Sequence, residues 1–164
     1  MQEKGILKPL LQGIILIKNM DNKAFMYLKD ERAEGNNEQG IAVPLAMVVE
    51  NDPDTMLLIS VLLRNSGYNV IEASNGEKAL ALLHTNNPAI IFMDVQMPVM
   101  DGYTATRRIR EMADPYRSIP IIGLVAGTGS AEYKKCRAAG MNDYISKPFR
   151  LEEILGKLNL PPAA

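Results

Sequence analysis

Two carboxylates and one amine carry the strongest chemical signal in this sequence. Glu50, Asp94 and Lys147 end or follow short apolar segments, namely LAMVVE, AIIFMD and DYIS. If these segments are parallel strands of one sheet, the three side chains meet at its carboxyl edge. Two acids there can hold Mg²⁺ together with phosphoryl oxygens, and the ammonium group can neutralise a further oxygen. An aspartate in this setting can itself be the nucleophile that forms an acyl phosphate.

The elements that must position these residues can be followed from Leu45 onward. Helical spacing of apolar residues separates short apolar runs, which lie at 45–50, 69–73, 89–94, 120–125 and 143–146. Five strands alternating with five helices predict an α/β fold whose parallel sheet is covered on both faces. Helix starts are marked as well. Asp52 stands before Pro53 as an N-cap, and Ser74 opens the capping-box pattern SNGE.

The first 44 residues differ in character from the rest. Residues 20–40 are polar with a Gly/Asn-rich end, and we interpret them as a linker that is partly helical at Asn22–Ala33. Residues 5–19 share with 144–159 an apolar pair, Lys-Pro and then a helix-like pattern. This similarity suggests the tail of a preceding, similar domain, and the alternative is an unrelated amphipathic extension. The predicted division is an extension over 1–44, a domain over 45–159 and a tail over 160–164.

Composition argues against several classes of protein. The chain has 164 residues, a formal net charge of −1 and no basic block, so no nucleic-acid footprint is indicated. Its single cysteine excludes an internal disulfide and fits a reducing compartment. No apolar run approaches the ~20 residues that span a bilayer, and no cleavage site follows the apolar segment 9–17. We expect a cytoplasmic protein without direct membrane insertion.

Four segments resemble the receiver domain of two-component response regulators. They are VVENDPDT (48–55), MDVQMPVMDGYTATRRIR (93–110), PIIGLVAGT (120–128) and AAGMNDYISKPF (138–149). The similarity covers about residues 45–159 and is strongest to receivers of hybrid sensor histidine kinases. It implies a flavodoxin-like (CheY-like) fold, a doubly wound five-stranded parallel sheet of order 2-1-3-4-5. It also implies that Asp94 accepts phosphate from a histidine kinase or a histidine phosphotransfer protein.

The resemblance further implies roles around the acceptor. Glu50, Asp94 and the backbone carbonyl of Gln96 match the family's Mg²⁺ ligands. Lys147 matches the lysine that contacts the phosphoryl group. Tyr144 matches the aromatic residue that changes rotamer on activation.

Asn51 departs from the family pattern, which has a second acid there as a direct metal ligand. Three interpretations are open: the Asn51 amide oxygen ligates in a weakened site, Asp52 substitutes for the lost acid, or the metal site is dead. Asp52 already has a role as the N-cap before Pro53. Mg²⁺ keeps several waters and needs few carboxylates, so binding should weaken rather than vanish. We therefore expect a Mg²⁺ site that is damaged but not shifted.

Val125 is the second departure, because the family has a Thr or Ser there as its switch hydroxyl. Valine is close to threonine in shape but cannot hydrogen-bond a phosphoryl oxygen. Such a charge-assisted bond is worth roughly 1.5–3 kcal/mol. We expect weaker coupling between phosphorylation of Asp94 and movement of Tyr144.

The leading hypothesis is a phosphorelay receiver that signals through protein contacts and is not an enzyme. The alternative is a degenerate receiver, a binding module that works without phosphorylation, which Asn51 and Val125 both motivate. A third hypothesis, an aspartyl-phosphate phosphatase, is disfavoured. Such enzymes usually have a second acid two residues after the nucleophile, where this sequence has Gln96.

Overall fold

The chain is described in three stretches. The computed structural model covers residues 14–18, 24–28 and 43–158. They belong to two compact units, 1–42 and 43–164, which we describe one at a time. The predicted tail 160–164 and most of the predicted linker lie outside the described residues.

In the first unit, strand β1 (Ile14–Lys18) pairs antiparallel with β2 (Ala24–Leu28). The prediction of partly helical structure at Asn22–Ala33 is therefore wrong for residues 24–28. Likewise, β1 is a strand where the comparison with residues 144–159 predicted a helix-like pattern. The physical reason is composition: IILIK and AFMYL are rich in β-branched and aromatic residues, which favour strands once a partner is available.

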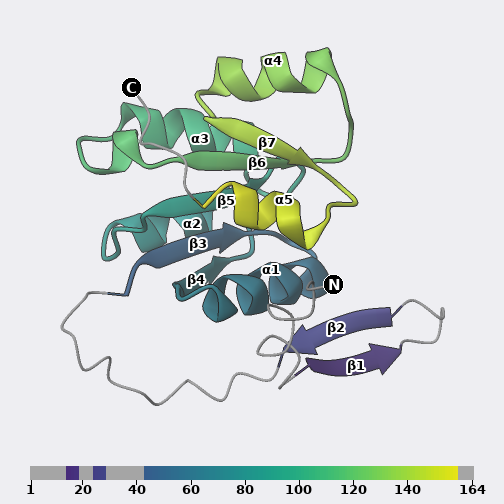
Figure 1. The fold of residues 1–164 in the computed structure, drawn as a ribbon. Helices are drawn as coiled ribbons and strands as arrows, with labels where there is room; N and C mark the ends of the chain where they lie inside the picture. Colours follow the sequence, from purple (N-terminus) through teal and green to yellow (C-terminus); the bar gives the residue numbers. More distant parts are fainter. Residues whose placement is uncertain (1–13, 19–23, 29–42, 159–164) are drawn as a thin grey trace, which may run out of the picture. The chain divides into compact units, whose positions relative to one another are not determined.

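The second unit contains a five-stranded sheet in which all strands are parallel, in the order β4-β3-β5-β6-β7 (Figure 1). The strands are β3 (Leu45–Val49), β4 (Asn69–Ala73), β5 (Ile90–Asp94), β6 (Ile121–Val125) and β7 (Asp143–Ser146). Counted within this unit, the order is 2-1-3-4-5, which confirms the predicted topology. The three central strands, β3, β5 and β6, are almost wholly buried, as their nearly unbroken apolar sequences predicted.

Five helices and one short 3₁₀ helix connect these strands. They are α1 (Pro53–Asn65), α2 (Gly76–Leu83), α3 (Gly102–Glu111), η1 (Tyr116–Ser118), α4 (Ser130–Ala139) and α5 (Leu151–Gly156). In the described ranges, no helix is both long enough and apolar enough to cross a bilayer.

The helix caps agree with the sequence at α1 and differ by one residue at α2. Asp52 caps α1 as predicted. At α2 the cap is Asn75, whose side chain accepts from the backbone N–H of Lys78 at 3.0 Å, and not Ser74. Asparagine is as strong an N-cap as serine. The hydroxyl of Ser74 instead accepts from the Lys78 ammonium at 2.8 Å.

Two apolar clusters fill the two sides of the sheet. Along β3, Ala46 and Val48 join the cluster with side chains of α1 and α5, while Met47 and Val49 join the one with α2, α3 and α4. This alternation follows from the two-residue period of a strand. Helices α1 and α5 therefore cover one face and α2–α4 the other (Figure 1), which leaves the carboxyl edge of the sheet as the place for polar side chains.

Candidate functional site

The carboxyl edge of the sheet brings together the acid–acid–amine set seen in the sequence. Glu50 follows β3, Asp94 ends β5, and Lys147 follows β7. The ammonium nitrogen of Lys147 lies 2.6 Å from Glu50 Oε2 and 3.2 Å from Asp94 Oδ2. Its backbone N–H donates to the carbonyl of Val125 at 2.7 Å. One cation therefore bridges two carboxylates that are distant in sequence.

The charges at this edge are desolvated and do not balance. Glu50 is 1% exposed and Asp94 is 4% exposed. Burial raises the pKa of Glu50, while hydrogen bonds from Lys147 and from the N–H of Asp52 act in the opposite direction. With both acids ionised, a single ammonium group leaves one negative charge uncompensated. A cation added at this edge would meet favourable electrostatics.

Asn51 lies next to Asp94, and its side-chain amide can take two orientations that give different contacts. In one, the amide oxygen lies 3.2 Å from Asp94 Oδ2 and 3.1 Å from the carbonyl oxygen of Gln96. Three oxygens then face one another with no hydrogen between them. In the other, the amide nitrogen takes that position and donates to both oxygens.

This oxygen cluster fits a magnesium ion. Ligands at ~2.1 Å in an octahedron lie about 3.0 Å apart along its edges, close to the separations around Asn51. The donors are an amide oxygen, a carboxylate and a carbonyl, all of them hard oxygen ligands. Within the described part of the chain, no group of three or more His, Cys, Asp or Glu side chains is placed to hold a metal. A cation at this edge would thus rely on Asn51 and Gln96 alongside the carboxylates.

The carboxylate of Asp52 is hydrogen-bonded within the first turn of α1. It accepts from the backbone N–H of Thr55 at 2.9 Å and from the Thr55 hydroxyl at 2.5 Å. These bonds lower the pKa of Asp52. Only its backbone N–H turns to the site, where it donates to Glu50 Oε1 at 3.0 Å. This geometry supports the helix-cap interpretation of Asp52 over that of a substitute metal ligand.

The loop after β5 packs tightly around Asp94. The N–H of Gln96 donates to Asp94 Oδ1 at 3.2 Å. A Cβ at position 102 would lie 2.1 Å from the carbonyl oxygen of Asp94, so only glycine fits there. Val99, at a positive φ of 70°, is 74% exposed. The Asp-Gly pair at 101–102 could signal the tight turn, whereas nothing in the sequence pattern predicted the conformation of Val99.

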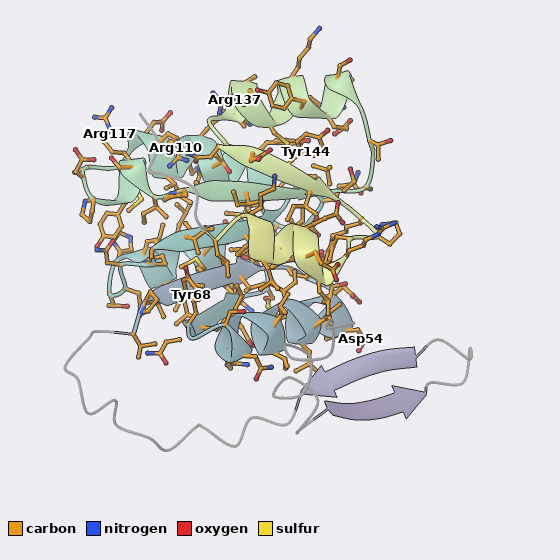
Figure 2. All side chains as sticks on the ribbon, viewed as in Figure 1. Asp54, Tyr68, Arg110, Arg117, Arg137 and Tyr144 are labelled. Atoms are coloured by element: carbon orange, nitrogen blue, oxygen red, sulfur yellow. The ribbon has the colours of Figure 1, made fainter. Side chains whose placement is uncertain are left out.

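The predicted switch positions lie on neighbouring strands, β6 and β7. Val125 is fully buried at the end of β6. Tyr144, labelled in Figure 2, is partly buried on β7, and its ring centre lies 6.1 Å from that of Tyr133 on α4. The nearby hydroxyl of Ser146 donates to the carbonyl of Gly127 at 2.9 Å. Ser146 is thus already engaged with the backbone and is not free to replace a hydroxyl at position 125.

Comparison with known proteins places this geometry in a family. Residues 46–159 match the response regulator receiver domain. Hybrid signal transduction histidine kinase C of Dictyostelium discoideum is 40% identical over 120 residues, which are 68% of this chain and 10% of that protein. Sensor histidine kinase RcsC of Escherichia coli is 33% identical over 155 residues, 94% of this chain and 16% of that protein. The chain therefore spans only a small part of the length of these curated relatives.

A solved structure extends the comparison to the site. The receiver domain of a sensor histidine kinase from Pseudomonas aeruginosa is 36% identical, with a TM-score of 0.64. The match covers 70% of this chain and 93% of that chain, and a magnesium ion is coordinated in the active site cleft of that protein.

Proposed function

The chain belongs to the response regulator receiver domain family of two-component systems, and on that premise we propose that Asp94 is its phosphoacceptor. In the proposed reaction, an Asp94 carboxylate oxygen attacks the phosphorus of a phosphohistidine on a partner protein. The new bond is P–O, the bond that breaks is P–N, and the leaving imidazole takes up a proton. The observation that carries this proposal is the Lys147 ammonium 3.2 Å from Asp94 Oδ2.

In this proposal each residue at the edge has a distinct task. Lys147 contacts an oxygen of the incoming phosphoryl group as a positive point charge. Glu50 holds that ammonium in place through the 2.6 Å ion pair. The N–H of Gln96 fixes the other carboxylate oxygen of Asp94, so that Oδ2 is the oxygen nearer to the cationic side.

We propose that Glu50, Asn51, Asp94 and the carbonyl of Gln96 hold Mg²⁺, which when bound neutralises phosphoryl oxygens. The amide of Asn51 supplies an oxygen but no charge, so the site should be weaker than one with a second acid. Loss of one of the negative charges that face the cation should weaken its binding about tenfold or more. Asp52 stays outside this ligand set because its carboxylate caps α1.

The wider proposals follow from the family. We propose that the chain is a cytoplasmic, non-enzymatic module whose partners are a histidine kinase or a histidine phosphotransfer protein. Its proposed division is an extension over 1–44, a receiver over 45–159 and a tail over 160–164. Family membership supports the phosphorelay function, and it does not favour the alternative of a binding module independent of phosphorylation.

Phosphotransfer from a charged donor tests this proposal. A histidine phosphotransfer protein carrying radiolabelled phosphate is mixed with wild type, Asp94→Asn and a matched control, Asp101→Asn. Asp101 caps α3, and asparagine caps as well as aspartate, so the control keeps the fold and the acceptor. We expect label on wild type and on the control but not on Asp94→Asn. Equal labelling of all three proteins, or labelling of none by any donor tried, would contradict the assignment.

A further inference from the structure

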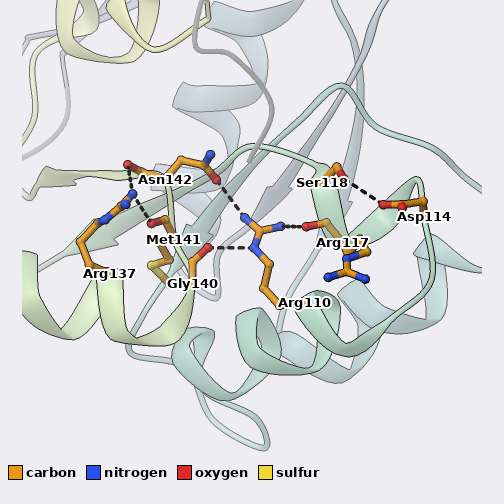
Figure 3. Close-up of a pocket in the computed structure, with 8 residues that line it drawn as sticks. All are labelled: Arg110, Asp114, Arg117, Ser118, Arg137, Gly140, Met141 and Asn142. Atoms are coloured by element: carbon orange, nitrogen blue, oxygen red, sulfur yellow. Dashed lines mark hydrogen bonds between the residues drawn. The ribbon is translucent and has the colours of Figure 1, made fainter. Parts of the chain in front are cut away.

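A second polar site lies at the edge of the sheet opposite Asp94. It is a pocket of about 360 Å³, formed where α3 and α4 end and where β6 and β7 begin (Figure 3). Arg110, Arg117 and Arg137 line it, and Asp114 is its one acidic residue. In Figure 2 these arginines lie away from Asp54, which is in the first turn of α1 and marks the phosphoacceptor edge.

Arg110 is fixed in the wall of this pocket by four hydrogen bonds. Its guanidinium lies between Gly140 and Asn142 on one side and Arg117 on the other (Figure 3). Nε donates to the carbonyl of Gly140 at 2.8 Å, and Nη2 donates to the amide oxygen of Asn142 at 2.9 Å. Nη1 donates to the carbonyls of Arg117 and Ile119, each at 2.8 Å. All four acceptors are neutral, so the charge is held without a counter-ion from them.

Among the described residues, Arg117 and Arg137 have no carboxylate partner either. Arg137 donates through Nη1 to the carbonyls of Met141 and Asn142, at 3.2 and 3.1 Å. The ion pairs found within residues 43–158 include none of the three arginines. The carboxylate of Asp114 accepts from the hydroxyl of Ser118 at 2.9 Å. Of the described lining residues, three arginines face one aspartate, which leaves an excess of two positive charges at the pocket.

Among the three arginines, Arg110 is partly buried, whereas Arg117 and Arg137 are exposed at the rim of the pocket. Desolvation lowers the pKa of the Arg110 guanidinium, which nevertheless stays charged. A desolvated cation gains from an anion more than a solvated one does. Because Arg110 is already held rigid, little conformational entropy is lost when a ligand binds to it.

We propose that this pocket binds a small molecule bearing phosphate groups. A guanidinium group can match two oxygens of a phosphate with parallel hydrogen bonds. Arg137 keeps its Nε and Nη2 donors for such a contact, Arg117 lines the same space, and Arg110 adds its charge and one remaining N–H. The volume is within the range of small-molecule sites, ~300–1,000 Å³. The chain's net charge of −1 argues against a nucleic-acid polymer as the occupant. This site is separate from the proposed phosphoacceptor, and its ligand is bound but not transformed.

Titration of the full-length protein followed by ¹H–¹⁵N NMR tests the proposal. The probes are inorganic phosphate and pyrophosphate, added in EDTA-containing buffer at an ionic strength held constant with sodium chloride. We expect saturable shifts at the amides of Arg117, Gly140, Met141 and Asn142, with pyrophosphate binding more tightly than phosphate. Asp94→Asn should bind both probes as the wild type does.

Three variants test whether the arginines of the pocket bind the phosphate probes. Arg117→Gln and Arg137→Gln should each weaken binding about tenfold or more, because each loses a charge-assisted contact. Arg108→Gln is the matched control, since Arg108 is exposed on α3 outside the pocket, and it should bind like the wild type. Arg110 is left intact because its bonds hold the fold together. Shifts that do not saturate, shifts centred on Lys147, or equal affinity in all three folded variants would overturn the proposal.

Discussion

Replacing Asn51 by aspartate changes the charge of the pocket around Asp94 while keeping the shape of the side chain. In the metal-free protein the amide can donate to Asp94 Oδ2 and to the Gln96 carbonyl. A carboxylate at position 51 has no hydrogen to donate and would face both oxygens as an acceptor. With magnesium bound, the same carboxylate becomes a charged ligand. Asn51→Asp should therefore destabilise the metal-free state and strengthen magnesium binding.

The separations in the structure set the size of these effects. Two unit negative charges 3.2 Å apart repel by about 1.3 kcal/mol in water and about 5 kcal/mol at an effective dielectric constant of 20. Because Asn51 is exposed and Lys147 lies beside Asp94, we expect the lower end, about 1–2 kcal/mol. In a domain of this size that lowers Tm by about 5 °C or more. Relief of the same repulsion by the cation should tighten magnesium binding about tenfold or more.

Thermal unfolding with and without magnesium measures both effects at once. Wild type, Asn51→Asp and Asn69→Asp are melted in EDTA and then across a series of magnesium concentrations. Asn69 is exposed at the start of β4, at the other edge of the sheet, so its substitution controls for added charge alone. Asn51→Asp should melt lowest in EDTA and gain most from magnesium. If it melts above wild type in EDTA, or its magnesium dependence equals that of Asn69→Asp, the reasoning about this pocket fails.

Three further predictions concern the same edge of the sheet. Lys147→Met leaves Glu50 and Asp94 buried without their shared cation. Urea unfolding at neutral pH should show that the free energy of unfolding falls by about 3–5 kcal/mol. An unchanged unfolding midpoint would show that the two ion pairs are not important for stability. Val125→Thr supplies the missing hydroxyl, so the NMR shift of Tyr144 on phosphorylation should grow; a smaller shift would contradict the coupling argument. Burial raises the folded-state pKa of Glu50 above its ordinary value of 4.5. The stability that protonated Glu50 contributes is therefore fully present below pH 4.5 and is lost as the pH rises through the folded-state pKa. Glu50→Gln should thus gain stability relative to wild type as pH increases above 4.5 in parallel urea titrations, and the opposite slope would show that the pKa is not raised.

The strands of the second unit could be predicted from the sequence, because each one is a short apolar run. The apolar runs from Leu45 to Ser146 match the five strands of the second unit to within one residue. Their order came from the resemblance to the family and not from periodicity, since alternating strands and helices fit more than one order. The cap of α2 was misplaced because Ser74 and Asn75 are both good caps. The hydrogen bond from the backbone N–H of Lys78 to the Asn75 side chain identifies the cap in the structure.

Part of the site around Asp94 could also be predicted from the sequence. Residues at strand ends can be assigned to one edge from the sequence, which is how Glu50, Asp94 and Lys147 were grouped. The orientation of the Asn51 amide could not be assigned, because it depends on two oxygens supplied by another loop. The arginine-lined pocket could not be predicted from the sequence either. Its residues come from two segments, 110–118 and 137–142, that are separated in sequence, and nothing in the run RRIR indicates that only Arg110 of these arginines lines it.

We propose that Asp94 accepts a phosphoryl group at a site that still uses magnesium. Intact-mass measurement after incubation with acetyl phosphate, with and without Mg²⁺, tests it most directly on wild type, Asp94→Asn and Asn51→Asp. We expect a single magnesium-dependent, base-labile phosphate adduct on wild type, none on Asp94→Asn and a faster-forming adduct on Asn51→Asp. An adduct that persists in Asp94→Asn would contradict the assigned acceptor. An adduct that forms only in Asn51→Asp would contradict the claim that the natural site functions.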